Sequence, residues 1–300
     1  MSAKSSRDLA KAFRIKDGGR FRLKQVDPAE RAGFKSKELA AATLERGVER
    51  LAALQERLYA HDRWAVLVIF QAMDAAGKDS TIKHVMSGVN PQGCQVFAFK
   101  APSAEELDHD FLWRTTRCLP ERGRIGIFNR SYYEETLVVR VHPELLEKQR
   151  LPEGLVTRDV WTERFDDINA YERHLARNGT NILKFFLHVS RDEQRRRFLE
   201  RLEDPTKNWK FSPADLGERD RWDEYMAAYE DMIRRTATPH APWYVVPADH
   251  KWFTRLVVVE VIVDALERLN PTFPTVPASE HRALATARAS LKAEGKGKEA

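Results

Sequence analysis

Short apolar runs alternate with amphipathic patterns along most of the chain. Five runs of four to eight residues are mainly apolar and have the length of strands that are buried on both faces. Between them, apolar residues recur three or four positions apart, which is typical of helices. This alternation predicts an α/β fold with a five-stranded parallel sheet, and right-handed crossovers would place helices on both faces. The predicted strands are 65–70, 95–99, 125–128, 182–189 and 243–246, and the predicted helices are 38–59, 78–87, 105–118, 158–177, 192–203 and 219–236.

The two ends of the chain lack this alternation. Residues 1–37 are rich in Lys and Arg and show little periodicity, so we expect an irregular N-terminal arm. The pattern then predicts one domain over residues 38–270, followed by a C-terminal extension over 271–300. Its tail, 292–300, mixes Gly with Lys and Glu, and we expect this end to be disordered.

Composition excludes several classes of protein. Apolar residues make up 42% of the 300, which is enough for a core and excludes a disordered chain. The longest unbroken apolar run, 64–70, is too short to span a bilayer, and residues 1–11 contain no apolar signal segment. Two cysteines, Cys94 and Cys118, cannot form a disulfide framework, so we expect a cytoplasmic protein without membrane contact.

A candidate phosphate-binding loop follows the first predicted strand. Small residues over 75–77 allow backbone N–H groups to turn inward around an anion, and the start of a helix near Lys78 adds the positive end of its dipole. Lys78 supplies a charge, and Ser80 or Thr81 offers a hydroxyl. The segment departs from the common G-x-x-x-x-G-K-[ST] pattern because it has Ala72 and Asp79 at two of the defined positions. The alternative is a tight turn with a solvated lysine.

Acidic and amide side chains near this loop suggest a metal site. A carboxylate at Asp74 would repel a bound phosphate unless a cation lay between them, which points to Mg²⁺. Kinases with such loops commonly have Asp at the end of the third predicted strand, where this chain has Asn129 and, five residues later, Glu134. Arg130 would lie beside the phosphates. The alternatives are a helix cap for Asp74 and a structural ion pair for Arg130.

A basic segment follows the fourth predicted strand. Arg197 and Arg201 are four residues apart and share one face of a predicted helix. The position of the segment, about residues 191–220, suits a lid that closes over the phosphate loop and excludes water. The alternative is a solvated helix face.

Four separated motifs in this order resemble the polyphosphate kinase 2 family. The loop and its continuation, 73–93, resemble the Walker A region of the family, and 128–134 is similar to its Walker B region. Residues 205–212 with Asp215 are similar to the lid, and 241–249 with Lys251 to the last strand. The resemblance covers about residues 20–270. Asn129 followed by Glu134 resembles the subgroup called class III, whereas other subgroups have Asp at the first of these positions.

This resemblance implies the fold of P-loop nucleotide kinases with a helical lid. It also implies phosphoryl transfer from inorganic polyphosphate to AMP or ADP, which yields ADP and ATP. Mg²⁺, with Mn²⁺ as an alternative, would be held by Asp74, Asn129 and Glu134. Asp74, Lys78, Arg130, Arg197 and Arg201 would act in catalysis. Polyphosphate and nucleotide would be bound by Ala75, Ala76, Gly77, Lys78, Asp79, Ser80, Thr81, Lys83, Lys207 and Lys210. We expect a homo-oligomer.

Two other functions stay open at this point. The first is an ATP-dependent nucleotide or small-molecule kinase with the same fold. The second is a non-enzymatic protein that binds a polyanion or nucleic acid through the arginines of 191–201. The chain has 50 Lys and Arg against 45 Asp and Glu, and this net charge of +5 is small for 300 residues. We therefore expect no nucleic-acid partner.

Overall fold

The computed structural model describes residues 6–34 and 36–296 of the chain, and it has an α/β fold around a six-stranded mixed sheet. The strand order is β1-β6-β5-β2-β4-β3, in which β2 to β6 are mutually parallel and β1 pairs antiparallel with β6. The prediction of five parallel strands is confirmed, but the sheet contains one strand more than the five that were predicted. The missed strand has only two residues, too few for a periodic pattern. The strands are β1 Arg14–Ile15, β2 Ala65–Gln71, β3 Cys94–Ala98, β4 Ile125–Asn129, β5 Thr180–His188 and β6 Trp243–Pro247.

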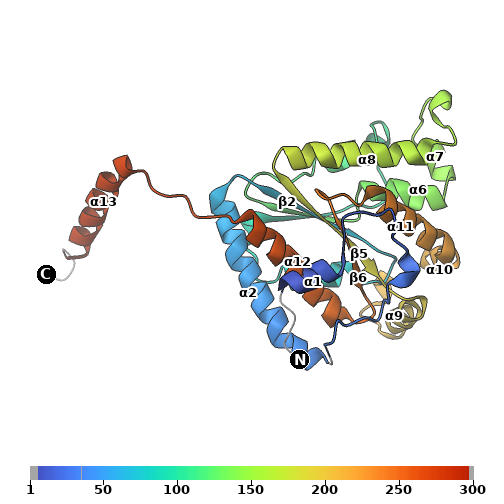
Figure 1. Cartoon of the computed structure of the whole chain (residues 1–300), viewed down its shortest axis with the longest axis horizontal. Helices are drawn as coiled ribbons and strands as arrows, with labels where there is room; N and C mark the ends of the chain where they lie inside the picture. Colours follow the sequence, from blue (N-terminus) through green and yellow to red (C-terminus); the bar gives the residue numbers. More distant parts are fainter. Residues whose placement is uncertain (1–5, 35, 297–300) are drawn as a thin grey trace.

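Helices cover both faces of the sheet. The helices α8 and α11 lie on one side, and α2 and α12 lie on the other, where α12 packs against α1, α2 and α3 (Figure 1). The apolar stretch of α12 is buried from Leu256 to Leu266, so it shows no amphipathic pattern and was not predicted. The longer helices are α2 Lys37–His61, α3 Lys78–Val85, α8 Val160–Arg177, α9 Arg191–Glu203, α10 Ala214–Asp220, α11 Trp222–Thr236 and α12 Lys251–Leu269.

The predicted helix over residues 105–118 is wrong. Two short helices replace it, because Ser103 and Glu106 form a capping box at the first and the Asp110 carboxylate accepts the N–H of Leu112 between them. The short elements are α4 Ala104–Leu107, α5 Trp113–Thr116, α6 Val138–Val141, α7 Glu144–Glu147, η1 Leu23–Gln25, η2 Pro91–Gly93, η3 Tyr132–Thr136, η4 Glu153–Leu155 and η5 Asn208–Lys210.

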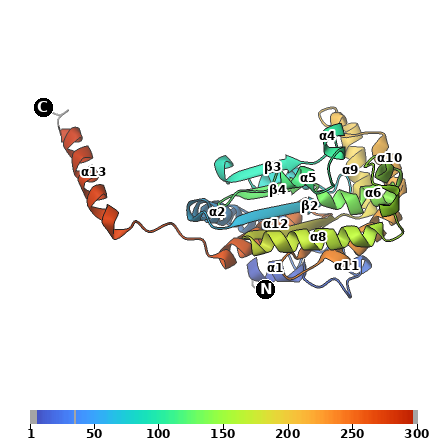
Figure 2. The same cartoon turned by 90° about the horizontal axis from the view of Figure 1, so that it is seen from above.

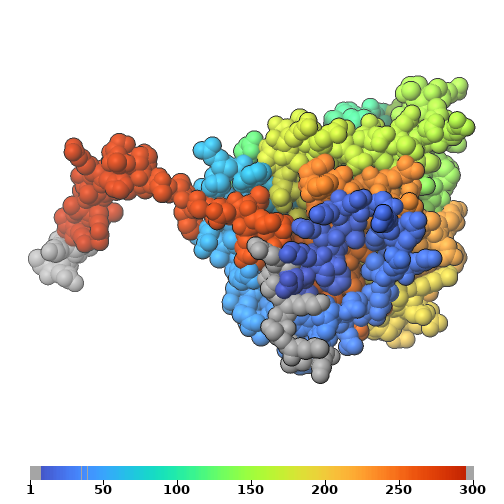
Figure 3. Space-filling view, in the orientation of Figure 1, coloured from blue at the N-terminus to red at the C-terminus, as the bar shows by residue number. Residues whose placement is uncertain are grey.

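The N-terminal segment contains more regular structure than the irregular arm that the sequence predicted. It forms helix α1 Ser6–Ala12 and strand β1, and it lies across one face of the body (Figure 3). Leu9 is fully buried, and the ring of Phe13 packs edge-on against Phe253 with centroids 5.9 Å apart. The described part of this segment therefore belongs to the core.

The C-terminal extension projects away from the body (Figures 1 and 2). After a Pro-rich stretch it forms α13 Ala278–Lys296. The predicted disorder of 292–300 is wrong for residues 292–296, and residues 297–300 lie outside the described part. Of the helices that the structure describes, none combines the length and the apolarity that crossing a bilayer requires.

The five parallel strands bring five loops to one edge of the sheet. Phe70 near the end of β2 pairs with Asn129 of β4 and with Phe185 of β5, and His188 at the end of β5 pairs with Pro247 of β6. The loops that follow these strands therefore meet at the carboxyl edge, where ligands bind in open α/β sheets.

Candidate active site

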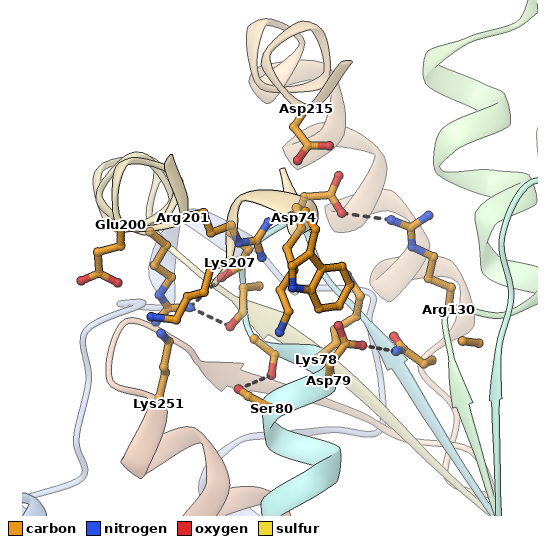
Figure 4. A pocket seen from close by; sticks show the side chains of 18 of the residues that line it. Asp74, Lys78, Asp79, Ser80, Arg130, Glu200, Arg201, Lys207, Asp215 and Lys251 are labelled. Carbon is orange, nitrogen blue, oxygen red and sulfur yellow. Dashed lines mark hydrogen bonds and ion pairs between the residues drawn. The ribbon is translucent and has the colours of Figure 1, made fainter. Parts of the chain in front are cut away.

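A cavity of about 890 Å³ opens at this edge (Figure 4). It is lined by the loop after β2, the end of β4, helix α9, the segment that leads into α10, and the start of α12. We call it the groove. Eight of the lining residues are basic and four are acidic, so the groove suits a polyanion better than a neutral ligand. The basic residues are Lys78, Lys100, Arg130, Arg197, Arg201, Lys207, Lys210 and Lys251.

The backbone of the loop between β2 and α3 has the conformation of an anion-binding turn. Ala75 and Gly77 have left-handed φ angles of 61° and 107°. The first N–H groups of any helix have no intrahelical acceptor. Among the described residues, no side chain caps the start of α3 in their place. Such a helix start attracts a phosphate through its N–H groups and its dipole. We call residues 72–80 the phosphate loop.

Lys78 is the buried cation of this loop. Its ammonium donates a hydrogen bond to the carbonyl oxygen of Ala72 at 2.8 Å, and the residue is 9% exposed. Burial lowers the pKa of Lys78 from its ordinary value, and the negative charge of Asp74 opposes this shift. A bound phosphate would supply a second anion and would favour the charged ammonium.

Asp74 lies between a positively charged and a negatively charged side chain. Its Oδ1 accepts a hydrogen bond from Nη2 of Arg130 at 2.9 Å, and the carboxylate of Asp215 points toward it from α10 (Figure 4). Burial and the charge of Asp74 raise the pKa of Asp215. Burial opposes the charge of Arg130, but Glu134 and Asp74 together raise its pKa. The structural ion pair considered for Arg130 is therefore present, and it lies inside the groove.

The three predicted metal ligands do not form one cluster. Asp74 and Asn129 line the groove, but Glu134 lines a second cavity and accepts a hydrogen bond from Nε2 of Gln71 at 2.7 Å. The amide nitrogen of Asn129 donates to Asp79. Among the described residues, no group of three or more His, Cys, Asp or Glu is arranged to hold a metal ion.

Helix α9 and the segment after it form one wall of the groove. Arg197 is 3% exposed and binds backbone carbonyls of the phosphate loop. Arg201, one turn later, donates to the carbonyl oxygen of Lys210 at 3.2 Å. Lys207 and Lys210 are exposed beside Trp209, whose side chain is 78% exposed.

Two residues predicted to bind phosphate do not line the groove. Thr81 is buried in α3, and its N–H donates to the carbonyl oxygen of Gly77. Lys83 is exposed on α3 outside the groove lining. Conversely, Asp215, Lys251 and Lys100 line the groove but were not predicted as site residues. Asp215 and Lys251 belong to the motifs that carry the family resemblance, whereas no motif contains Lys100.

A second cavity of about 250 Å³ adjoins the groove. Phe99 and Arg130 line both spaces, so the two meet at the end of β4. We call it the apolar cavity, because most of its wall is hydrophobic. Its apolar lining comprises Phe99, Ala101, Pro102, Leu107, Phe111, Tyr132, Val138, Val139 and Leu145.

Comparisons with known proteins place the chain among similar proteins. A family model described as Polyphosphate kinase 2 (PPK2) matches residues 34–274. An ADP-polyphosphate phosphotransferase from Rhodopseudomonas palustris is 54% identical, over 94% of this chain and 98% of the relative. An AMP/ADP-polyphosphate phosphotransferase from Meiothermus ruber is 47% identical, over 88% of this chain and 95% of the relative.

A solved structure is also similar over nearly its whole length. Polyphosphate Kinase 2 from Arthrobacter aurescens superimposes with a TM-score of 0.85 and 39% identity, covering 95% of this chain and 99% of that one. The family model alone spans more than half of the chain, so the resemblance that the sequence predicted is confirmed. This chain belongs to the polyphosphate kinase 2 family.

Proposed function

We propose that this chain is a polyphosphate:nucleotide phosphotransferase, which transfers a phosphoryl group from inorganic polyphosphate to AMP and ADP and yields ADP and ATP. The observation that carries the proposal is the junction at Arg130 of a basic groove, which contains the phosphate loop, with an apolar cavity. One substrate is then a bare polyanion and the other has an apolar, aromatic part. The relatives from Rhodopseudomonas palustris and Meiothermus ruber are named as phosphotransferases of polyphosphate with ADP and with AMP or ADP.

The groove is the proposed donor site. Inorganic polyphosphate is a linear chain of phosphates without a base or a sugar, so it needs cations and N–H donors rather than apolar walls. The phosphate loop would hold the phosphate that is transferred, and Arg201, Lys207, Lys210 and Lys251 would hold those that follow. The base of α9 is bound to the phosphate loop through Gln194 and Arg197, so closure of the outer part of the predicted lid segment 191–220 would exclude water from the transfer.

The apolar cavity is the proposed acceptor site. Phe99 and Phe111 offer aromatic surface to a nucleobase, and the wall also contains the polar side chains of Arg114 and Gln149. A nucleotide whose base lies there would direct its phosphate toward Arg130. The guanidinium of Arg130 would then contact both substrates and stabilise charge in the transition state.

A divalent cation fits the acidic part of the groove. The carboxylate of Asp215 faces that of Asp74 (Figure 4), and burial together with the charge of Asp74 raises the pKa of Asp215. Carboxylate and amide oxygens are ligands that Mg²⁺ prefers, so we propose Mg²⁺, with Mn²⁺ as the alternative, held by Asp74 with Asp215 facing it and Asn129 in the same groove. Glu134, the third predicted ligand, lines the adjoining cavity and would act on the ion only from there. The ion would neutralise charge on the phosphates. Assembly as a homo-oligomer in the cytoplasm stays a prediction.

A substrate-exchange assay tests the proposal. Purified protein is incubated with polyphosphate, Mg²⁺ and either ADP or AMP, and the nucleotides formed are measured. We expect ATP from ADP, ADP from AMP, and loss of both products with a chelator. Transfer that requires ATP as the donor would identify an ATP-dependent kinase instead. Retention of Mg²⁺-dependent transfer in excess DNA would exclude the non-enzymatic, nucleic-acid-binding alternative, whereas absence of any transfer would support it.

A further inference from the structure

Two side chains of α9 bind three consecutive carbonyl groups of the phosphate loop. Nε2 of Gln194 donates to the carbonyl oxygen of Asp74 at 3.0 Å. Nη1 of Arg197 donates to the carbonyl oxygens of Ala75 at 3.0 Å and Ala76 at 2.7 Å. Gln194 and Arg197 are three residues apart and share one face of the helix, so both reach the loop from the same side.

The remaining donors of Arg197 also bind protein atoms. Nε donates to Oε1 of Glu193 at 2.7 Å, and Nη2 donates to the carbonyl oxygens of Ala248 at 2.5 Å and Asp249 at 3.2 Å. A guanidinium has five N–H groups, and these contacts together with those to Ala75 and Ala76 make five hydrogen bonds. Four of these five bonds go to two loops of the protein, and the fifth goes to Glu193 of the same helix.

We propose that Gln194 and Arg197 are positioning residues that hold the phosphate loop in its phosphate-binding conformation. The proposal rests on the proposed function for the identity of the phosphate donor. A trans peptide unit directs each N–H opposite to the preceding carbonyl. Hydrogen bonds that draw the carbonyls of Asp74 and Ala76 toward α9 therefore turn the N–H groups of Ala75 and Gly77 away from α9.

The backbone of the loop explains why such support is needed. Ala75 has a φ of 61°, and a left-handed conformation at a residue with a side chain persists only where the surroundings enforce it. Without the bonds from α9, the loop would relax and its N–H groups would lose their common direction. Each binding event would then include the free energy of reordering the loop.

Other parts of the fold hold the base of α9, by which we mean the part of the helix that contains Gln194 and Arg197. Oε1 of Gln194 accepts a hydrogen bond from Nη1 of Arg219 at 2.9 Å. The loop that Arg197 binds is held by Asp249, whose Oδ1 accepts the N–H of Ser190 at 2.8 Å and whose own N–H donates to the carbonyl oxygen of Pro28 at 3.1 Å. The N-terminal segment thus supports the phosphate loop through Asp249 and Arg197.

Amide hydrogen exchange combined with kinetics tests the proposal in the full chain. The variants are Arg197→Lys, which keeps the charge but cannot span both loops, and Gln194→Met, which keeps the length but removes the donor. Arg195→Lys makes the same substitution at an exposed position of the same helix and is the matched control. Exchange is followed without ligand in peptides that cover residues 72–80 and, as an internal reference, β2.

We expect exchange over 72–80 to be at least tenfold faster in Arg197→Lys and Gln194→Met than in the parent, with β2 unchanged. In the same two variants, kcat/KM for polyphosphate should fall at least tenfold, whereas Arg195→Lys should match the parent in both measurements. A fall in Gln194→Met is the critical observation, because this residue has no charge that could act on a phosphate.

Three results would overturn the proposal. One is parent-like kinetics in Arg197→Lys, since the charge alone would then suffice. Another is parent-like exchange over 72–80 in both variants. The third is faster exchange in β2 as well, which would mean a general loss of stability. Exchange is measured without substrate, so a parent enzyme that does not use polyphosphate would refute the proposed function and leave the loop measurement valid.

Discussion

The two halves of one groove wall are built differently. At the base of α9, Gln194 and Arg197 are 1% and 3% exposed, and their polar atoms bind the phosphate loop and the loop after β6. In the outer half, Lys207, Trp209 and Lys210 are exposed, and Arg201 is only partly buried. The base is a fixed part of the core, whereas the outer half presents its charges to solvent.

This difference shows that residue type and spacing do not determine the role of an arginine. Arg197 and Arg201 lie on one helix face and both line the groove, as their spacing predicts. The two residues differ in burial. The buried guanidinium of Arg197 binds carbonyl oxygens in place of water, whereas the more exposed guanidinium of Arg201 stays partly hydrated. Large effects on activity are therefore expected from changes at the base, and small, salt-dependent effects from changes in the outer half.

Replacement of the buried cation should have the largest effect. Lys78→Ala removes the charge beside the transferred phosphate, and kcat should fall at least about 100-fold, equivalent to about 3 kcal/mol of transition-state stabilisation. Lys83→Ala is the matched control, because Lys83 is a lysine of the same helix that does not line the groove. Steady-state kinetics of both variants, with circular dichroism to verify folding, provides the measurement. Equal losses in the two variants would contradict the placement of Lys78.

The stability of the protein should depend on pH through His188, which lies at the end of β5, just before α9. Burial lowers the pKa of His188 from 6.5 to about 4, although the charge of Asp249 opposes the shift. The unfolded chain then binds more protons than the native protein between these values, so stability is lost as the pH falls from 6.5 toward 4, by up to about 3 kcal/mol. Urea unfolding at several pH values should show this loss in the parent and a smaller one in His188→Gln. Identical pH dependence in both would exclude His188 as the cause.

The sequence predicted the parts of the fold that depend on local pattern. Parallel strands buried on both faces are continuous apolar runs, and β2, β4 and β6 were located within one residue at each end. Helix α12 could not be predicted in this way, because it is buried on all sides and has no polar face. The interruption between α4 and α5 depends on side-chain hydrogen bonds to the backbone that no periodicity reveals.

For the site, too, the sequence predicted residues that belong to a continuous motif and missed those that only the fold brings together. The phosphate loop has a fixed order along the chain, and Asp74, Lys78 and Asp79, which the sequence predicts as site residues, line the groove. Glu134 was placed there by its distance along the chain, but it lines the apolar cavity and its carboxylate accepts a hydrogen bond from Gln71. Four of the five hydrogen bonds of Arg197 go to backbone carbonyls, which every residue has, and no residue pattern can identify such partners.

Asn129→Asp tests the balance of charge beside Asp79 in the groove. The amide of Asn129 donates to Asp79, so an aspartate there would place two carboxylates together. Without a divalent ion we expect a melting temperature about 2–4 °C lower, equivalent to about 1 kcal/mol for a chain of this size. Mg²⁺ should restore more stability in this variant than in the parent. Asn129→Ala removes the bond without adding charge and should lack the additional response to Mg²⁺. An identical response in all three proteins would place the ion away from Asn129.

Replacement of Arg201 should have the smallest effect and is the direct counterpart of the change at Arg197. If the outer half only attracts the polyanion, Arg201→Lys should keep kcat within about twofold of the parent, because lysine keeps the charge. Arg201→Ala should raise KM for polyphosphate severalfold at low salt, and the difference should shrink as ionic strength rises, because exposed charges are screened. Kinetics at two salt concentrations, with the melting temperature as a check on folding, measures both. A fall in kcat of tenfold or more in Arg201→Lys would remove the distinction between the two halves, because it would require a guanidinium in the transition state at the exposed position as well.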